Sequence, residues 1–245
     1  MVQKNILDKS IQNLVIKYKE KIERYSIDDF LKSDVDPFRF GFNVILWGLR
    51  ETVQREIQHK LEMALENLIG DFHEDYLGNV IHEPTKTNWR IVPKGEIKGI
   101  DIANEKNNWY LQIKSKFNSM NSSSANNLAT QLQELSEKGS NGIFGCGWVI
   151  AGSKRKCIGE KKISEVAKVF KGKDLYSFVA GNADEMDEVI EAFPPAVENE
   201  LDEIARARIT GLIESAIERV QKDLEKLAED QEMSVVEFLY ERAVR

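Results

Sequence analysis

The stretch GIDIANEKNNWYLQIK, residues 99–114, decides the fold of this 245-residue chain. Apolar and polar residues alternate at Gly99–Ala103 and again at Trp109–Lys116, which is typical of β-strands. The polar residues Glu105–Asn108 between them are typical of a turn. The stretch therefore predicts an antiparallel hairpin, and its apolar positions are expected to face a core: Ile100, Ile102, Leu111 and Ile113.

Three polar residues of this hairpin are candidates for chemistry. Gln112 and Lys114 are two positions apart and share a face of their strand, and antiparallel pairing brings Asp101 beside them. Carboxylate and amide oxygens suit a hard cation such as Mg²⁺, and a lysine neutralises charge that develops on a phosphate. The spacing alone is weak evidence, because many surface hairpins carry an Asp and a Lys by chance.

The rest of the chain predicts an α/β (α+β) fold, in which a mixed sheet of about four or five strands is flanked by helices. Further strands are predicted at 89–92, 143–151 and 175–180. Helices are predicted at 7–25, 26–31, 40–76 with an interruption near Gly48, 122–137 behind a serine cap, 183–192 ending before two prolines, 197–228, and after Ser234. A single domain is expected, with a helical region at 1–76, an α/β core at 84–181 and an acidic helical part at 183–245.

Charge is unevenly distributed along the chain. Residues 184–245 hold 18 of the 41 acidic and 7 of the 34 basic residues, a net charge of −11, whereas residues 84–173 hold 16 basic and 7 acidic residues, a net charge of +9. An acidic protein can still offer a basic face to a polyanion. The basic middle therefore favours nucleic acid as a partner, although lysines also simply solvate surfaces.

Composition excludes several classes of protein. Two cysteines and three histidines are too few for a disulfide scaffold, a cysteine zinc cluster or a histidine-rich metal site. No apolar run is long enough to span a membrane, and the first residues lack the apolar segment of a secretion signal. A cytoplasmic protein without a membrane partner is expected.

Three blocks of sequence carry a resemblance to a known family: DPFRF at 36–40, ENLIGDFHEDYLG at 66–78 and QIKSKFNSMN at 112–121. In this order they resemble type II restriction endonucleases of the PD-(D/E)XK nuclease superfamily, and most closely the branch that cuts GGNCC- or GGWCC-type sites. The resemblance covers roughly Asp36 to Leu135. Gln112 departs from the pattern, since an acid is usual there.

The resemblance implies catalytic roles for Asp101, Gln112 and Lys114. Asp101 is the expected metal-binding acid and Lys114 the catalytic lysine, with Mg²⁺ as the cofactor. Because Gln112 leaves the site one negative charge short, an acid from the preceding helix is expected to join the metal. Asp71 is favoured, then Glu74, then Glu66, and Gly70 suits a close approach of this helix to the hairpin. The full set of expected metal-binding residues is Asp101, Gln112, Ile113, Asp71 and Glu74.

Candidate DNA contacts lie in two segments. One leaves the catalytic strand and enters a helix, whose N-terminal N–H groups suit a phosphate; it supplies Lys116, Asn118, Ser119, Asn121, Ser122 and Ser123. The other is a basic loop that suits a phosphate clamp; it supplies Lys154, Arg155 and Lys156. A plain polar loop with a helix cap, and a solvated turn, are the alternatives.

The function implied by the resemblance is metal-dependent hydrolysis of double-stranded DNA at a short palindrome. A palindrome suits a homodimer, with the apolar stripe from Leu201 to Leu227 or the N-terminal helices as its interface. A cognate DNA methyltransferase is expected as a genetic partner. The alternatives are a related repair or recombination nuclease without site specificity, and a non-catalytic helical interaction protein.

Overall fold

In the computed structural model, the described residues are 3–32, 35–116, 120–137, 142–150 and 156–244. They form two compact units. The first consists of residues 1–14 and 69–199, and the second of residues 15–68 and 200–245. Helices α1 (Lys4–Glu23) and α4 (Leu49–Leu77) contribute residues to both units. Among the described residues, no helix combines the length and the apolar character that crossing a membrane requires.

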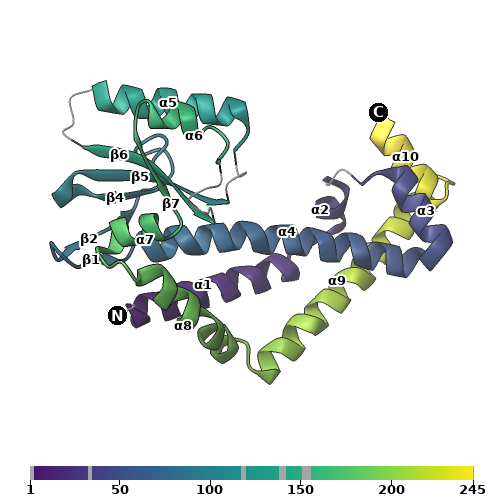
Figure 1. Cartoon of the computed structure of the whole chain (residues 1–245). Helices are drawn as coiled ribbons and strands as arrows, with labels where there is room; N and C mark the ends of the chain where they lie inside the picture. The colour runs from purple at the N-terminus through teal and green to yellow at the C-terminus, as the bar shows by residue number, and fades with distance from the viewer. Residues whose placement is uncertain (1–2, 33–34, 117–119, 138–141, 151–155, 245) are drawn as a thin grey trace. The chain divides into compact units, whose positions relative to one another are not determined.

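The first unit is built on a mixed five-stranded sheet (Figure 1). Its strands lie in chain order: β3 (Arg90–Ile91), β4 (Ile102–Asn104), β5 (Trp109–Lys116), β6 (Ile143–Ile150) and β7 (Lys168–Lys171). The first three strands pair antiparallel and the last three pair parallel. A separate pair, β1 (Ile81–His82) and β2 (Thr87–Asn88), is antiparallel. The predicted fold class and sheet size are confirmed.

The central hairpin forms as predicted. Ile102 pairs with Leu111, and Asn104 pairs with Trp109. A 3₁₀ turn, η1 (Glu105–Asn107), joins the strands and ends at Asn108, whose φ of 55° is left-handed. Asparagine tolerates this conformation better than most residues, which explains its place in the turn. The four predicted apolar positions are all buried.

Helices cover both faces of the sheet (Figure 1). On one face lie α5 (Ser122–Glu137) and α6 (Glu160–Ser164), and Leu128 and Leu132 of α5 share a core with Cys146 and Trp148 of β6. On the other face lies α7 (Lys173–Ala180), which presses so closely on β6 that a Cβ at Gly147 would lie 2.4 Å from Leu175. The sheet is therefore buried on both sides, which explains its apolar runs.

Two sequence-based expectations about elements are wrong. Residues 175–180 form helix α7, and the last strand is β7 instead. The buried residues of α7 are Leu175, Tyr176, Val179 and Ala180, a helical spacing that a short apolar run does not distinguish from a strand. Helix α8 (Glu185–Glu200) also continues through Pro194 and Pro195, both exposed, where loss of two N–H donors does not end the helix.

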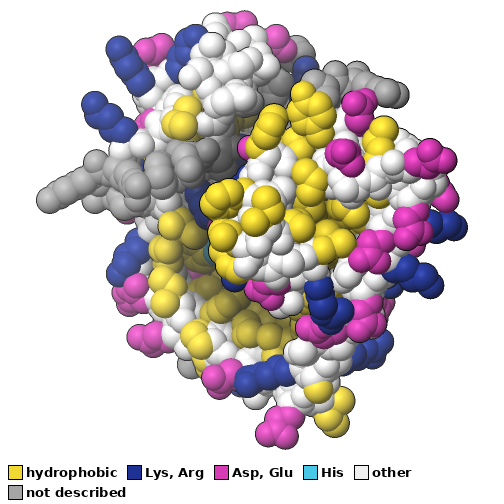
Figure 2. Space-filling model, turned by 90° about the vertical axis from the view of Figure 1, so that its right-hand side faces the viewer, with side chains coloured by type: hydrophobic (Ala, Val, Ile, Leu, Met, Phe, Trp, Pro, Cys, Tyr) yellow, Lys and Arg dark blue, Asp and Glu magenta, His cyan; other side chains and the backbone are white. Residues whose placement is uncertain are grey.

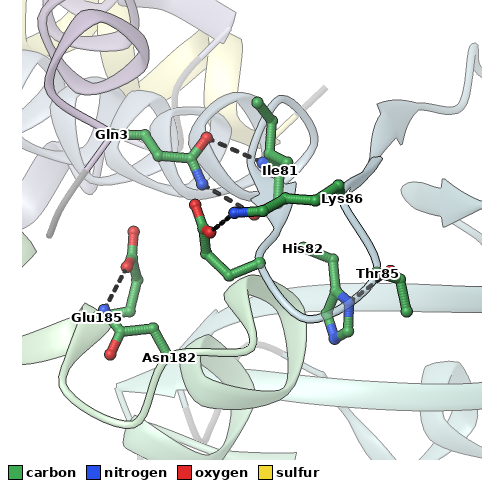
Figure 3. Close-up of polar contacts among 8 residues, drawn as sticks. Gln3, Ile81, His82, Thr85, Lys86, Asn182 and Glu185 are labelled. Carbon is green, nitrogen blue, oxygen red and sulfur yellow. Dashed lines mark hydrogen bonds and ion pairs between the residues drawn. The ribbon is translucent and has the colours of Figure 1, made fainter.

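Side-chain hydrogen bonds join segments of the first unit that lie far apart in the sequence. The amide of Gln3 donates to the carbonyl of Ile81 at 2.9 Å and accepts from its N–H at 2.9 Å, which ties the start of the chain to β1 (Figure 3). The buried carboxylate of Glu185 accepts from the hydroxyl of Tyr76 at 2.5 Å and from the amide of Asn182 at 3.0 Å. These bonds satisfy a charge that burial would otherwise make costly.

The second unit is helical. It contains α2 (Ile27–Lys32), α3 (Pro37–Trp47), α9 (Glu203–Glu229) and α10 (Val235–Val244), with parts of α1 and α4. Asp36 caps α3 by accepting from the N–H groups of Phe38 and Arg39 at 2.9 and 3.2 Å. The predicted interruption at Gly48 is confirmed, since this residue ends α3 with a φ of 80°. The core of the unit includes Phe30, Phe40, Ile57, Ile217 and Leu224.

Candidate functional site

Asp101 lies where three strands of the sheet meet. Its carbonyl accepts from the N–H of Val92 at 2.7 Å, and its own N–H donates to the carbonyl of Leu111 at 2.9 Å. Its carboxylate accepts from the N–H of Ile113 at 2.7 Å and from the side-chain amide of Gln112. The structure therefore brings Asp101 and Gln112 into contact, two of the three hairpin residues that the sequence singled out.

Gln112 is buried and turns its amide nitrogen toward Asp101. That nitrogen also lies 3.5 Å from the carbonyl oxygen of Ile113. Orientation of a glutamine amide follows from its hydrogen-bond partners, and here both partners are acceptors. In this arrangement Gln112 acts on Asp101 as a donor, whereas the sequence assigned it the role of an oxygen ligand.

Burial and neighbouring polar groups act in opposite directions on the pKa of the Asp101 carboxyl. Burial raises the pKa of the Asp101 carboxyl above its usual value. The Ile113 N–H, the Lys114 ammonium, the Gln112 amide and the Lys94 ammonium oppose this increase, because each stabilises the ionised form. Lys114 is half-buried on β5, the strand that also holds Gln112 and Ile113. The two expected catalytic residues therefore act on each other electrostatically.

Glu74 of α4 belongs to the same electrostatic group. The pKa of the Glu74 carboxyl is raised to about 7, first by burial and then by the negative charge of the Asp101 carboxylate. Lys114 and Lys94 lower it, while Asp71 raises it. Two carboxyl groups with raised pKa values beside each other are typical of a functional site.

The structure favours a different acid of α4 as the neighbour of Asp101 from the one that the sequence favoured. Glu74 is half-buried and interacts with Asp101 and Lys114, whereas Asp71 is exposed. Glu66 is exposed and belongs to the second unit. The geometry therefore favours Glu74, which the sequence placed second, because helical spacing alone does not say which face of α4 turns toward the hairpin.

Lys94 is a residue that sequence reasoning missed. It lies in the turn between β3 and β4, and its ammonium lowers the pKa of both Glu74 and Asp101. Its neighbours Pro93 and Gly95 mark a turn in the sequence, but no spacing rule links this turn to the hairpin residues. Only the paired strands bring it to the site.

The oxygen atoms of this site can be compared with the ligands that Mg²⁺ takes in proteins. No group of three or more His, Cys, Asp or Glu side chains in the described part of the chain is arranged as a metal site. The carboxylates of Asp101 and Glu74 and the carbonyl of Ile113 are hard oxygen donors, however, and Mg²⁺ usually takes only one or two carboxylates and keeps several waters. The residues present therefore fit this ion.

The close approach of α4 to the sheet occurs mainly at Gly78. A Cβ at Gly78 would lie 2.6 Å from Ile91 and 3.1 Å from Ile102, closer than side chains tolerate. At Gly70, a Cβ would lie 3.6 Å from Ser115, an ordinary contact. Gly70 faces β5 as expected, but Gly78 is the position that requires a glycine.

Among the candidate DNA contacts, Asn121 has a structural role. Its side-chain oxygen accepts from the N–H of Ser124 at 2.8 Å, so Asn121 rather than a serine caps α5. Lys116 ends β5, and Ser122 and Ser123 are exposed in the first turn of α5. Asn118, Ser119, Lys154 and Arg155 lie outside the described residues.

A groove of 710 Å³ joins the two predicted DNA-binding segments. Ser122 and Asn126 of α5 line it, together with the exposed Lys156. Lys161 and Lys162 of α6, which sequence reasoning did not single out, also line it, and the Lys162 ammonium donates to Asn126 at 2.7 Å. The groove thus gathers lysines beside the N-terminus of α5, with Glu160 and Glu165 at its margin.

Comparison with known proteins gives two findings. Residues 1–202 match the family described as Eco47II restriction endonuclease, so the match is wider than the stretch from Asp36 to Leu135 that carried the resemblance. The chain is also 27% identical over 130 residues to the type II restriction enzyme Sau96I of Staphylococcus aureus. That alignment covers 52% of this chain and 47% of the relative, about half of its length.

Proposed function

Since the chain belongs to the Eco47II restriction endonuclease family, we propose that it is a type II site-specific deoxyribonuclease. Its substrate is double-stranded DNA with a short palindromic site, and its cofactor is Mg²⁺. Water attacks a backbone phosphate in line, and the products carry 5′-phosphate and 3′-hydroxyl ends. The enzyme acts in the cytoplasm as a homodimer, beside a DNA methyltransferase that protects the same site.

The observation that carries this proposal is the grouping of Asp101, Glu74 and Lys114 around the β4–β5 hairpin, where each acid interacts electrostatically with the other and with the lysine. Asp101 and Glu74 would hold the ion through their carboxylates, with the carbonyl of Ile113 as a third oxygen. The chemistry that Mg²⁺ would supply there is that of a Lewis acid toward the phosphate and the attacking water.

The remaining residues position the phosphate and the acids. The Lys114 ammonium neutralises the charge that develops on the attacked phosphate. Gln112 and the Ile113 N–H hold the Asp101 carboxylate in a fixed orientation through two hydrogen bonds. Lys94 is exposed and adds positive charge beside the two acids, which favours the approach of the DNA backbone.

Cleavage of phage DNA tests the proposal. The full chain is incubated with phage DNA and Mg²⁺, and the ends of the fragments are sequenced. Discrete bands with one sequence at every end are expected, and chelation of the metal should abolish them. Lys114→Ala should remove cleavage and keep the fold and specific binding.

Lys106→Ala is the matched control, because this exposed lysine lies on the same hairpin, in its turn. It should cut at the wild-type rate. A smear in place of bands would indicate a nuclease without site specificity. Absence of cleavage with Mg²⁺, Mn²⁺ and Co²⁺ would overturn the proposal and leave a binding protein.

A further inference from the structure

One face of α3 is strongly apolar and exposed. Its residues recur at helical spacing and include Phe38, Phe42, Ile45 and Leu46, with 75%, 64%, 85% and 54% of their surface exposed. Tyr240 of α10 packs edge-on against Phe38 at a ring distance of 5.6 Å. Figure 2 faces this end of the second unit and shows hydrophobic side chains gathered there in one patch. We call these five residues the α3 face.

The size of the α3 face sets it apart from ordinary surface residues. An aromatic side chain presents roughly 150–250 Å², so the five residues expose on the order of 600 Å² of mainly apolar surface. The largest patch of a typical monomer is about 300–600 Å², and each partner in a stable complex contributes about 800 Å². The α3 face therefore approaches the size of an interface.

The α3 face also borders a hollow. A pocket of 480 Å³ lies between α3 and α10, lined by Phe38, Gly41, Phe42, Val236 and Tyr240 among others. The two helices pack closely there, because a Cβ at Gly41 would lie 2.9 Å from Val236. One surface thus carries a ridge, ending in Ile45 and Leu46, and a preformed apolar pocket beside it.

We propose that the α3 face is the homodimer interface, with the Ile45–Leu46 ridge of each copy seated in the pocket of the other. A twofold axis makes such an interface self-complementary, because each ridge–pocket contact occurs twice. This inference rests on the proposed function, in which a palindrome presents one scissile phosphate to each of two copies. It places the interface away from the Leu201–Leu227 stripe, whose buried members Ala216, Ile217, Val220 and Leu224 are already used in the core.

The charges around the pocket argue for a protein partner. Glu232, Glu237 and Glu241 line it, so its margin is acidic and repels the phosphates of DNA. An apolar centre with a charged margin is the usual anatomy of a protein interface. The exposed, apolar Ile45–Leu46 ridge of a second copy matches the apolar centre of this pocket without any further molecule.

Sedimentation equilibrium of the full chain tests the interface. The wild type should be a dimer. In a double variant with Ile45→Glu and Leu46→Glu, the dissociation constant of the dimer should rise about a hundredfold or more, because the interface would bury unpaired charges. The matched control is Ile204→Glu, which changes an 80% exposed residue of α9 in the same unit. It should remain dimeric, and circular dichroism should show all three proteins folded.

Two further readouts separate the interface from the activity. Ile45→Cys should give a covalent dimer with a short bismaleimide, and Ile204→Cys should not. On supercoiled plasmid, the double variant should accumulate nicked circles where the wild type gives linear DNA.

A wild type that cuts DNA as a monomer would overturn the interface and keep the function. A double variant that stays dimeric, or a cross-link only at position 204, would also overturn the interface. Loss of the dimer in the double variant, in a chain that cuts no DNA with any metal, would support the interface and remove the function.

Discussion

The side-chain amide of Gln112 donates a hydrogen bond to the carboxylate of Asp101. Gln112 occupies the strand position where an acid is usual in the nucleases that the hairpin resembles, so a donor stands here in place of a second carboxylate. Glu74 of α4, whose carboxyl interacts with Asp101 and Lys114 and has a pKa of about 7, supplies this negative charge when it is ionised. The site therefore divides its acids between the sheet and a helix.

The helix acids should differ in their contribution to cleavage. Glu74→Gln should lower the cleavage rate at least about a hundredfold, because it removes the carboxylate that we propose as a metal ligand beside Asp101. Asp71→Asn, three positions earlier on α4 and exposed, is the matched control and should have a much smaller effect. Single-turnover rates over a range of Mg²⁺ concentrations measure both. A larger loss for Asp71→Asn would restore the order that the sequence favoured.

Gln112 should be replaceable by glutamate but not by leucine. Gln112→Glu places a carboxylate against Asp101, so it should lower the melting temperature without metal and increase the stabilisation that Mg²⁺ provides. It should keep measurable cleavage, whereas Gln112→Leu should lose cleavage, because Asp101 loses a donor. Thermal unfolding with and without Mg²⁺ checks the first point.

Gln58→Glu is the control for added charge, since this residue is exposed on α4 in the second unit. Its metal-induced shift should equal that of the wild type. An equal shift in Gln112→Glu would place the metal away from Gln112.

Recognition of bases should depend on the start of α5. Asn121→Ser keeps the cap, because serine also accepts from the helix N–H groups, but removes the amide. Cognate affinity should fall by about 1–3 kcal/mol with non-specific binding unchanged. Asn121→Ala would also lose the cap, so it does not separate the two roles.

Lys116→Ala should weaken binding to all DNA alike and lower the salt slope by about one unit, as expected for a phosphate contact. Fluorescence anisotropy at several salt concentrations measures both effects. If Asn121→Ser leaves site preference unchanged, recognition lies elsewhere, and the groove with Lys156 becomes the next segment to test.

Alanine should destabilise the protein at Gly78, which follows α4, but not at Gly70 within α4. Gly78→Ala should lower the free energy of unfolding by about 1–3 kcal/mol, because the added methyl overlaps Ile91. Gly70→Ala should be neutral or stabilising by up to about 1 kcal/mol, since alanine favours a helix and only an ordinary contact with Ser115 forms. Urea denaturation measures both, and a large loss at Gly70 would contradict the assigned spacing.

The fold class and the hairpin could be predicted from the sequence because both depend on local periodicity. Alternation places Gln112 and Lys114 on one face, and the Glu105–Asn108 turn fixes the register that brings Asp101 beside them. The interruption at Gly48 followed from the same kind of signal. Short apolar runs carried less information, so residues 175–180 were expected as a strand and form a helix.

The sequence by itself determined the hairpin, the acid and lysine that it carries, and the resemblance to restriction endonucleases. Only the tertiary structure decided that Gln112 donates to Asp101, that Glu74 and Lys94 join the site, and that the α3 face stays uncovered. The physical reason is that strand periodicity is set by neighbours in the chain. The side of a helix that meets a sheet, and the face that remains exposed, depend on contacts between residues far apart in sequence.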